Sequence, residues 1–229
     1  MSSHPATGSR HFHDQLEHLT QHLLEMSHQA EASIHLAVDA FLQRDEAKAD
    51  AVLTREHYLN ALELEIEQLA ISLLALQQPM ARDLRFVISV IKISSDLERV
   101  GDHAVNIAQS TLRVVQEKAV IVSHPEIEDM ARSARGMLGD ALDAFVRADG
   151  PLGRDVCLRD DAVDAIYGSF FRKLITRMRE DPSTITVALE FLLVSRNIER
   201  VADLATNIAE DAVYLAEGRS IKHGGTGAT

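Results

Sequence analysis

Two segments of this chain repeat one spacing of side chains that carry oxygen ligands. Each segment reads Glu-x-x-x-Asp-x-x-x-Asn. The residues are Glu98, Asp102, Asn106, Glu199, Asp203 and Asn207. Because an α-helix turns by about 100° per residue, residues four apart form a stripe along one side of the helix. Carboxylate and amide oxygens are hard ligands, which favour Mg, Ca, Mn or Fe over the metals that prefer thiolates.

A second pair of oxygen ligands precedes each stripe. Glu56 and Asn60 precede the first stripe, and Asp160 and Asp164 precede the second. If the two helices pack side by side, three or four carboxylates meet in one groove and repel one another. A multivalent cation would relieve this repulsion. The carboxylates could also bridge one bound ion to another, which allows a multinuclear cluster. We expect the first set to bind cations more weakly, since Asn60 lacks the charge of Asp164. The alternative interpretation is that both stripes are ordinary solvated helix faces.

The two stripes belong to an internal duplication. The 13 residues from Asp96 match those from Asn197 at eight positions, with an offset of 101. The segment at 55–60 aligns with 159–164 at an offset of 104, and Pro79 aligns with Pro182 at 103. Three segments in register at nearly one offset indicate a repeated unit of about 100 residues.

Helical periodicity extends over almost the whole chain, which predicts an all-α protein of two tandem three-helix bundles. The bundles are predicted over 14–120 and 121–218, with flexible ends at 1–13 and 219–229. Six long helices are predicted. Five of them cover residues 14–43, 45–77, 81–118, 154–180 and 181–218. The remaining one, fourth in the chain, begins at the capping-box segment Ser123-His-Pro-Glu126 and ends at a break at Gly150–Gly153.

Charge and composition narrow the classes of function. The formal net charge is −12, which argues against binding nucleic acid, because phosphate neutralisation needs clustered Lys and Arg. The first ten residues lack the apolar segment of a signal peptide, and the longest apolar run, near 69–76, is too short to cross a membrane. We expect a cytoplasmic protein that meets a membrane only through a partner.

Three segments resemble the PhoU family, the accessory regulators of bacterial phosphate uptake. They are Gln78-Pro-Met-Ala-Arg-Asp-Leu-Arg85, the Asp96–Ile107 stripe segment and the Ile198–Glu210 stripe segment. Residues 160–167 and 218–223 are similar to the family as well.

The resemblance implies two three-helix bundles with metal clusters on their acidic surfaces, and the metal could be Fe, Mn, Mg, Ca or Zn. Carried over by position, the implied ligands are Glu56, Asn60, Glu98, Asp102, Asp160, Asp164, Glu199 and Asp203. The implied function is negative regulation of phosphate uptake and of the phosphate-starvation response. A non-enzymatic homodimer would link the ATPase subunit of the phosphate ABC transporter to a sensor histidine kinase.

Other polar residues near the stripes are candidates for supporting the ligands or contacting a partner. They are Arg99, His103, Asn106, Arg200 and Asn207. The N-terminal half is also rich in histidine. His18 and His22 are four residues apart and could share a transition metal, although the sequence supplies no evident third ligand.

Two other functions compete with the regulatory one. Carboxylate-rich helical sites also host phosphohydrolase and di-iron oxidase chemistry, and a plain metal store is a third possibility. The chain has no glycine-rich phosphate loop, no nucleophile elbow and no His-Glu-x-x-His motif, so we predict that it is not an enzyme.

Overall fold

The all-α prediction is confirmed in a computed structural model, which describes residues 6–117 and 124–221, and the side chains from Phe12 onward. Over these residues the chain forms six long helices and no strand. The helices are α1 (Ala6–Gln43), α2 (Glu46–Gln77), α3 (Ala81–Val115), α4 (Pro125–Arg147), α5 (Gly150–Glu180) and α6 (Ile185–Glu217), with a short 3₁₀ turn at Pro182–Thr184 before α6. None of the helices described is long and apolar enough to span a membrane.

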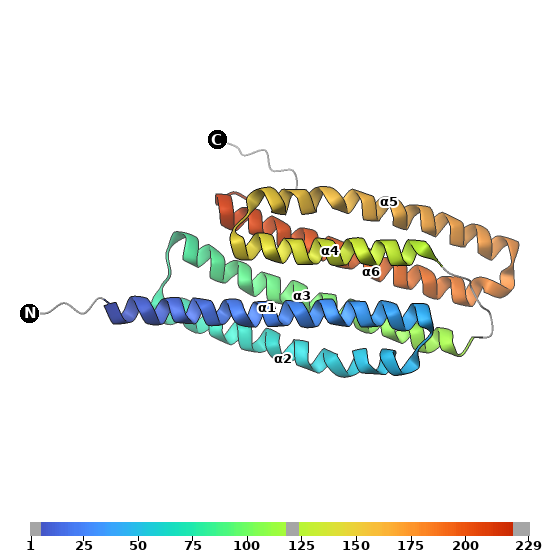
Figure 1. Cartoon of the computed structure of the whole chain (residues 1–229), viewed down its shortest axis with the longest axis horizontal. Coiled ribbons are helices and arrows are strands. Elements are labelled where there is room, and N and C mark those ends of the chain that lie inside the picture. Colours follow the sequence, from blue (N-terminus) through green and yellow to red (C-terminus); the bar gives the residue numbers. More distant parts are fainter. Residues whose placement is uncertain (1–5, 118–123, 222–229) are drawn as a thin grey trace, which may run out of the picture.

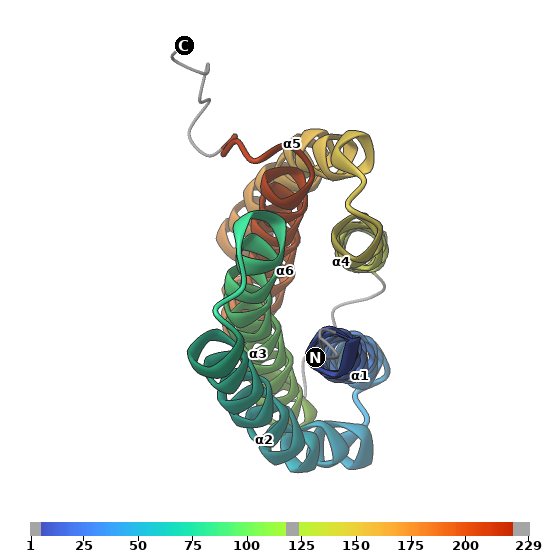
Figure 2. The same cartoon turned by 90° about the vertical axis from the view of Figure 1, so that its left-hand side faces the viewer.

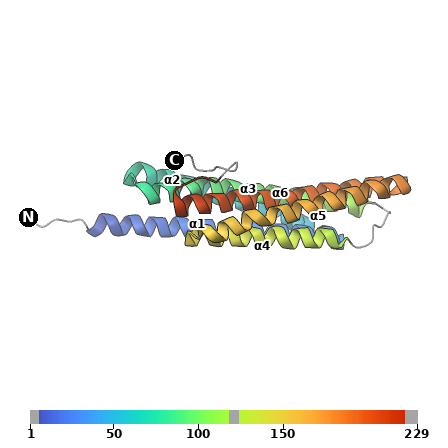
Figure 3. The same ribbon diagram turned by 90° about the horizontal axis from the view of Figure 1, so that it is seen from above.

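The helices form two layers that run along the long axis of the molecule (Figures 1 and 3). Seen end-on, α2, α3, α6 and α5 make a curved row, and α1 and α4 pack against its inner side (Figure 2). Helices α1–α3 form one three-helix unit and α4–α6 the other, so the two-bundle prediction is confirmed. The exact bounds 14–120 and 121–218 stay a prediction, because residues 118–123 lie outside the described part of the chain.

The core is built from small and branched aliphatic side chains, as the low aromatic content requires. In α3, Leu97, Val100, Ala104 and Ile107 are fully buried, which is the apolar stripe that the periodicity predicts. In α6, Ile198, Val201, Ala205 and Ile208 are buried at the equivalent positions. The two stripe helices therefore keep one face on the core and leave their carboxylates at its margin.

The two units meet along α3 and α6, which lie in the middle of the curved row (Figure 2). Three polar contacts join these helices. They are Lys92 Nζ–Asp211 Oδ1 at 3.2 Å, His103 Nδ1–Asn197 Oδ1 at 2.9 Å and Arg113 Nε–Glu190 Oε1 at 2.8 Å. As residue numbers rise along α3, the partners fall along α6, so the helices are antiparallel. Their crossing is centred near Gly101 and Ala202, the equivalent residues of the two stripes.

The break predicted at Gly150–Gly153 lies slightly earlier, at Ala148 and Asp149. Helix α5 begins at Gly150, and the Asp149 side chain caps it by accepting a hydrogen bond from the backbone N–H of Leu152 at 3.0 Å. Pro151 lies in the first turn, where its missing N–H costs nothing. Gly153 lies inside α5, where an added Cβ would lie 2.9 Å from the carbonyl oxygen of Ala209. These glycines thus permit close packing of α5 on α6.

Other helix ends differ from the predictions by a turn or two. Helix α1 begins at Ala6, so residues 6–13 are helical and the helix starts before the predicted residue 14. Helix α4 begins at Pro125, and its N-cap residue is His124, which makes no capping hydrogen bond through its side chain. Ser123, the predicted cap, lies outside the described residues. Gly218 ends α6 with φ of 70°, as predicted, because glycine adopts this left-handed conformation without strain.

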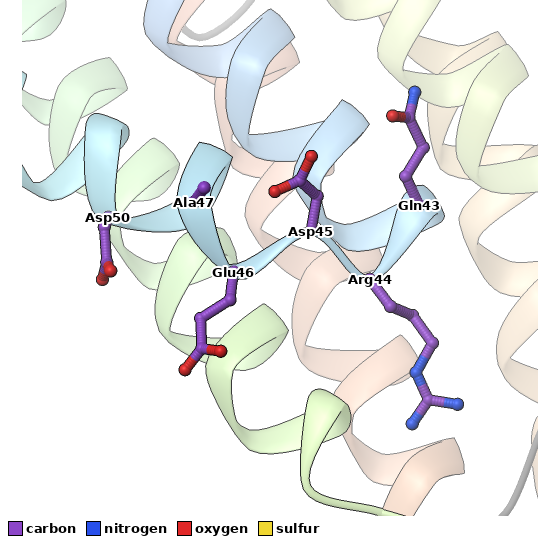
Figure 4. A pocket seen from close by; sticks show the side chains of 6 residues that line it. All are labelled: Gln43, Arg44, Asp45, Glu46, Ala47 and Asp50. Atoms are coloured by element: carbon purple, nitrogen blue, oxygen red, sulfur yellow. The ribbon is translucent and has the colours of Figure 1, made fainter.

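The turn between α1 and α2 is tied to the end of α3. Arg44 adopts a left-handed φ of 53°, and its guanidinium donates hydrogen bonds to the carbonyl oxygens of Val114 and Glu117. Asp45 caps α2 by accepting from the backbone N–H of Lys48. The turn encloses a surface hollow of about 660 Å³ (Figure 4), lined by Gln43, Arg44, Asp45, Glu46, Ala47 and Asp50. Two of its lining residues, Arg44 and Asp45, hold three helix ends together, which is a structural role.

Candidate functional site

The first acidic set lies where α2 and α3 pack side by side. Glu98 and Asp102 project from α3, and Glu56 projects from α2 close enough to raise the pKa of Glu98. Burial is the largest cause of the raised pKa of Glu98, followed by the negative charge of Asp102. The predicted meeting of the two helices' carboxylates is therefore present in this unit.

The first set also contains carboxylates that the sequence reasoning missed. Glu63 of α2 is among the charges that raise the pKa of Glu98, and its own pKa is raised by burial and by Glu67 and Asp102, while a hydrogen bond from Ser95 opposes the shift. Glu63 and Glu67 follow Glu56 at positions seven and eleven, which is the same helix face. This spacing could have been recognised in the sequence. Glu63 supplies to the first set the negative charge that Asn60 lacks.

The second acidic set lies between α5 and α6. Burial, together with the charges of Asp203, Asp164, Glu199 and Asp161, raises the pKa of Asp160 to about 6. Burial and Asp203 also raise the pKa of Glu199, which is only 9% exposed. All four predicted ligands of this unit are thus brought into one electrostatic cluster.

Arginines of α6 partly neutralise the second set. Arg200 pairs with Asp203 (Nη1–Oδ2, 2.7 Å) and with Glu199 (Nε–Oε2, 3.7 Å), and Arg196 pairs with Glu199 (Nη1–Oε1, 3.4 Å). In the first unit the equivalent Arg99 pairs with Asp96 at 3.3 Å, and Asp96 lies two residues before Glu98. Arg200 therefore braces its carboxylates directly, whereas Arg99 acts on Glu98 through its charge alone.

The donor atoms fit a hard cation best in the second set. Asp160 Oδ1 and Glu199 Oε2 are buried and accept no hydrogen bond. Buried carboxylate oxygens without a donor are costly unless a cation or water satisfies them. Over residues 6–117 and 124–221, however, no three His, Cys, Asp or Glu side chains already converge closely enough to hold an ion. A cation would have to draw the carboxylates inward and displace Arg200 from Asp203.

Comparison with known proteins identifies the family to which this duplicated three-helix arrangement belongs. The family model of the PhoU domain matches residues 23–111 and again residues 127–212. The chain belongs to the PhoU family. The resemblance seen in the sequence is thereby confirmed, and both matched segments contain one complete acidic set.

Relatives and solved structures match this PhoU-family chain over almost its whole length. It is 37% identical over 211 residues to the phosphate-specific transport system accessory protein PhoU homolog of Clostridium acetobutylicum, covering 92% of this chain and 96% of that protein. The protein of the same description from Caulobacter vibrioides is 39% identical over 208 residues, covering 91% and 90%. The crystal structure of PhoU from Pseudomonas aeruginosa has a TM-score of 0.88 at 35% identity and covers 91% of this chain and 100% of that one.

A pocket of about 290 Å³ in this PhoU fold connects the second acidic set to the first unit. Its lining comes from α3, α5 and α6 and consists of Arg99, His103, Asp160, Arg200, Asp203, Leu204, Thr206 and Asn207. His103 crosses from α3 to Asn197 of α6, and burial lowers its pKa. Six of the lining residues were predicted from the sequence as ligands or as supporting residues; Leu204 and Thr206 were not.

The remaining predicted residues have less specific positions. Asn60 lies one turn beyond Glu56 on α2 and is partly exposed, and Asn106 is exposed on α3. Asn207, its equivalent in the second PhoU domain, lines the pocket. The two halves of the molecule therefore use the third residue of the stripe differently.

Proposed function

We propose that the chain is an accessory regulator of a phosphate-specific transport system. Its relatives carry that description and match it over nearly their full length, which is the observation that carries the proposal. A structural relative from Streptococcus pneumoniae, described as a phosphate transport system regulatory protein, has a TM-score of 0.85 at 30% identity. The finer proposal is that this chain restrains phosphate uptake and the phosphate-starvation response.

The regulator acts in this proposal as a non-enzymatic, cytoplasmic adaptor and homodimer. Its partners are the ATPase subunit of the phosphate ABC transporter and a sensor histidine kinase, through which it meets the membrane indirectly. The net charge of −12 favours basic partner surfaces and opposes nucleic acid.

Metal ions on the acidic sets are part of the proposal. Glu56, Asn60, Glu63, Glu98 and Asp102 would hold ions in the first unit. Asp160, Asp164, Glu199 and Asp203 would hold them in the second. A bound cation supplies positive charge that cancels the repulsion among these carboxylates. Since each set spans two neighbouring helices, its residues would then tie α2 to α3 and α5 to α6, which stiffens the curved row.

Deletion of the gene in its host tests the regulatory role. A reporter from a phosphate-starvation promoter should be expressed constitutively in phosphate-rich medium, and the wild-type gene should restore repression. A strain whose reporter still responds normally to phosphate would refute the proposal. Pull-down of the transporter ATPase and the kinase on the purified chain then tests each partner separately.

Turnover assays separate the adaptor from an enzyme. Purified, metal-loaded protein should show no phosphatase or oxidase turnover above buffer. Turnover that disappears in Glu199→Gln/Asp203→Asn would favour the carboxylate-metal enzyme instead.

A further inference from the structure

Large apolar side chains are exposed at equivalent positions of the two units, at the offsets of 104 and 101 residues that relate them. Each of these side chains is between 37% and 53% exposed. The first apolar patch consists of Ile71 of α2 with Leu84 and Ile88 of α3, and the second consists of Ile175 of α5 with Ile185 and Leu189 of α6. Single exposed apolar residues are ordinary, whereas a group that is exposed at the same three positions in both units indicates a binding surface.

The two patches lie towards opposite ends of the molecule. Each patch adjoins the proline turn between its two helices, and the α2–α3 and α5–α6 turns are at opposite ends of the long axis (Figure 1). Helices α1 and α4 cover the inner side of the curved row, and α3 and α6 have a neighbour in the row on each flank (Figure 2). The exposed side chains of α3 and α6 therefore face the outer side of the row.

The helices that carry the two patches differ in charge. Residues 61–77 of α2 contain three acidic residues and neither Lys nor Arg. The equivalent residues 165–181 of α5 contain four basic and two acidic residues. The same part of the repeat is thus negative in the first unit and positive in the second.

These charges border the apolar side chains. Glu67 lies one helical turn before Ile71, and Arg172 and Arg179 lie one turn before and one turn after Ile175. All three charged side chains are exposed. Each patch therefore combines an apolar centre with a charged border, and the two borders have opposite signs.

We propose that the first apolar patch of one copy of the chain packs against the second apolar patch of another copy. A two-fold axis across the long axis of the molecule makes this contact twice, because it exchanges the two ends. Opposite charges then face each other, whereas two patches of the same kind would bring like charges together. The contact also removes the apolar side chains of both copies from water. The proposal rests on the homodimer of the proposed function and names the surface that forms it.

Sedimentation equilibrium of the full chain tests this surface through two charge reversals. Glu67→Arg makes the border of the first patch positive, and Arg172→Glu makes the border of the second patch negative. Each variant alone should dimerise about tenfold more weakly than the wild type, because like charges then meet. An equimolar mixture of the two variants should recover most of the affinity. In the mixed dimer one contact has both charges reversed and the other contact has neither.

Variants elsewhere and within the apolar centre complete the test. Asp129→Arg and Arg132→Glu reverse exposed charges of α4 and should leave the dimerisation constant unchanged. Leu189→Ser should weaken the dimer by about tenfold or more, since a large apolar side chain no longer leaves water on association. Circular dichroism should show the wild-type helix content in Leu189→Ser, because Leu189 is 48% exposed in the single chain.

Three results would overturn the inference and differ in what they leave standing. A dimer that is equally tight in the wild type, Glu67→Arg, Arg172→Glu and Leu189→Ser has its interface elsewhere, although the homodimer remains. A mixture that associates no more tightly than either charge variant alone excludes the pairing of unlike patches. A wild-type chain that stays monomeric, and that binds phosphatidylglycerol vesicles unless it carries Arg172→Glu, uses the second patch on lipid. The promoter reporter decides separately on the regulatory function.

Discussion

His103 of α3 contacts Asn197 of α6 at 2.9 Å, and this contact joins the two PhoU domains near the centre of their interface. Each residue lies on the helix that carries its own domain's acidic stripe. A hydrogen bond between side chains contributes about 0.5–1.5 kcal/mol to stability. A double-mutant cycle of His103→Ala and Asn197→Ala should therefore give a coupling of about 1 kcal/mol in the free energy of unfolding.

A control cycle that pairs His103→Ala with Arg82→Ala should show no coupling beyond about 0.3–0.5 kcal/mol, because Arg82 is exposed and lies about 30 Å away along α3. Equal coupling in the two cycles would mean that the contact with Asn197 contributes nothing specific.

Gly153→Ala should destabilise the protein by about 1–3 kcal/mol, the usual cost of overpacking a tight site. The new methyl group would lie 2.9 Å from the carbonyl oxygen of Ala209 and 3.0 Å from Val213 Cγ2. Since α5 and α6 would have to separate, this cost exceeds the helix-propensity gain of about 1 kcal/mol.

Gly136→Ala is the matched control, because its Cβ would meet nothing within 4 Å on α4. It should stabilise the protein by up to about 1 kcal/mol in urea unfolding. If both substitutions stabilise, α5 does not need the close approach that Gly153 permits.

In metal-free protein, Asp160→Asn should raise the melting temperature at about pH 7.5 and have no effect near pH 3.5. The folded-state pKa of Asp160, about 6, lies above its ordinary value of 3.8. The folded state therefore binds the proton more tightly than the unfolded state does. The resulting stability is present below about pH 3.8 and is lost as the pH rises through 6.

Thermal melts across this pH range check the effect, with Asp143→Asn as the control. Asp143 is an exposed residue of α4 that pairs with Arg147. An Asp160→Asn melting temperature that follows the wild type at every pH would show that the second acidic set is not under electrostatic strain.

Each acidic set should bind metal independently. Glu98→Gln/Asp102→Asn and Glu199→Gln/Asp203→Asn should each remove about half of the bound metal, since separated sites are nearly additive. Elemental analysis of purified protein by mass spectrometry measures the content. The control Asp129→Asn/Asp143→Asn removes two exposed carboxylates from α4 and should retain all of the metal. Unchanged metal in both stripe variants would refute the metal-binding proposal.

Local periodicity was enough to predict much of the fold. The apolar stripe of Leu97, Val100 and Ala104 and the offset of 101 residues identified six helices in two equivalent units. Both features can be read from the spacing of residues along the chain, without knowing how the helices pack.

Features that depend on packing between helices were not predictable in this way. Glu199 is only 9% exposed, because its place at the α5–α6 junction covers it, and the spacing of the stripe within α6 does not reveal this burial. Gly150 and Gly153 were interpreted as a break, since a sequence does not reveal that glycine is needed for close approach to α6. The approach of Glu65 of α2 to His22 of α1, at 3.9 Å, was not predictable for the same reason.

The α3–α6 crossing is symmetric about Gly101 and Ala202, which are equivalent residues of the two units. Lys92 lies nine residues before Gly101, and its partner Asp211 lies nine after Ala202. Arg113 lies twelve after Gly101, and its partner Glu190 lies twelve before Ala202. Two identical subunits related by a two-fold axis meet with this reciprocity. Because the two units are parts of one polypeptide, they need not be identical. The positions equivalent to His103 and Asn197 are Leu204 and Asp96, so this contact has no symmetric copy, whereas a strictly symmetric dimer would make it twice.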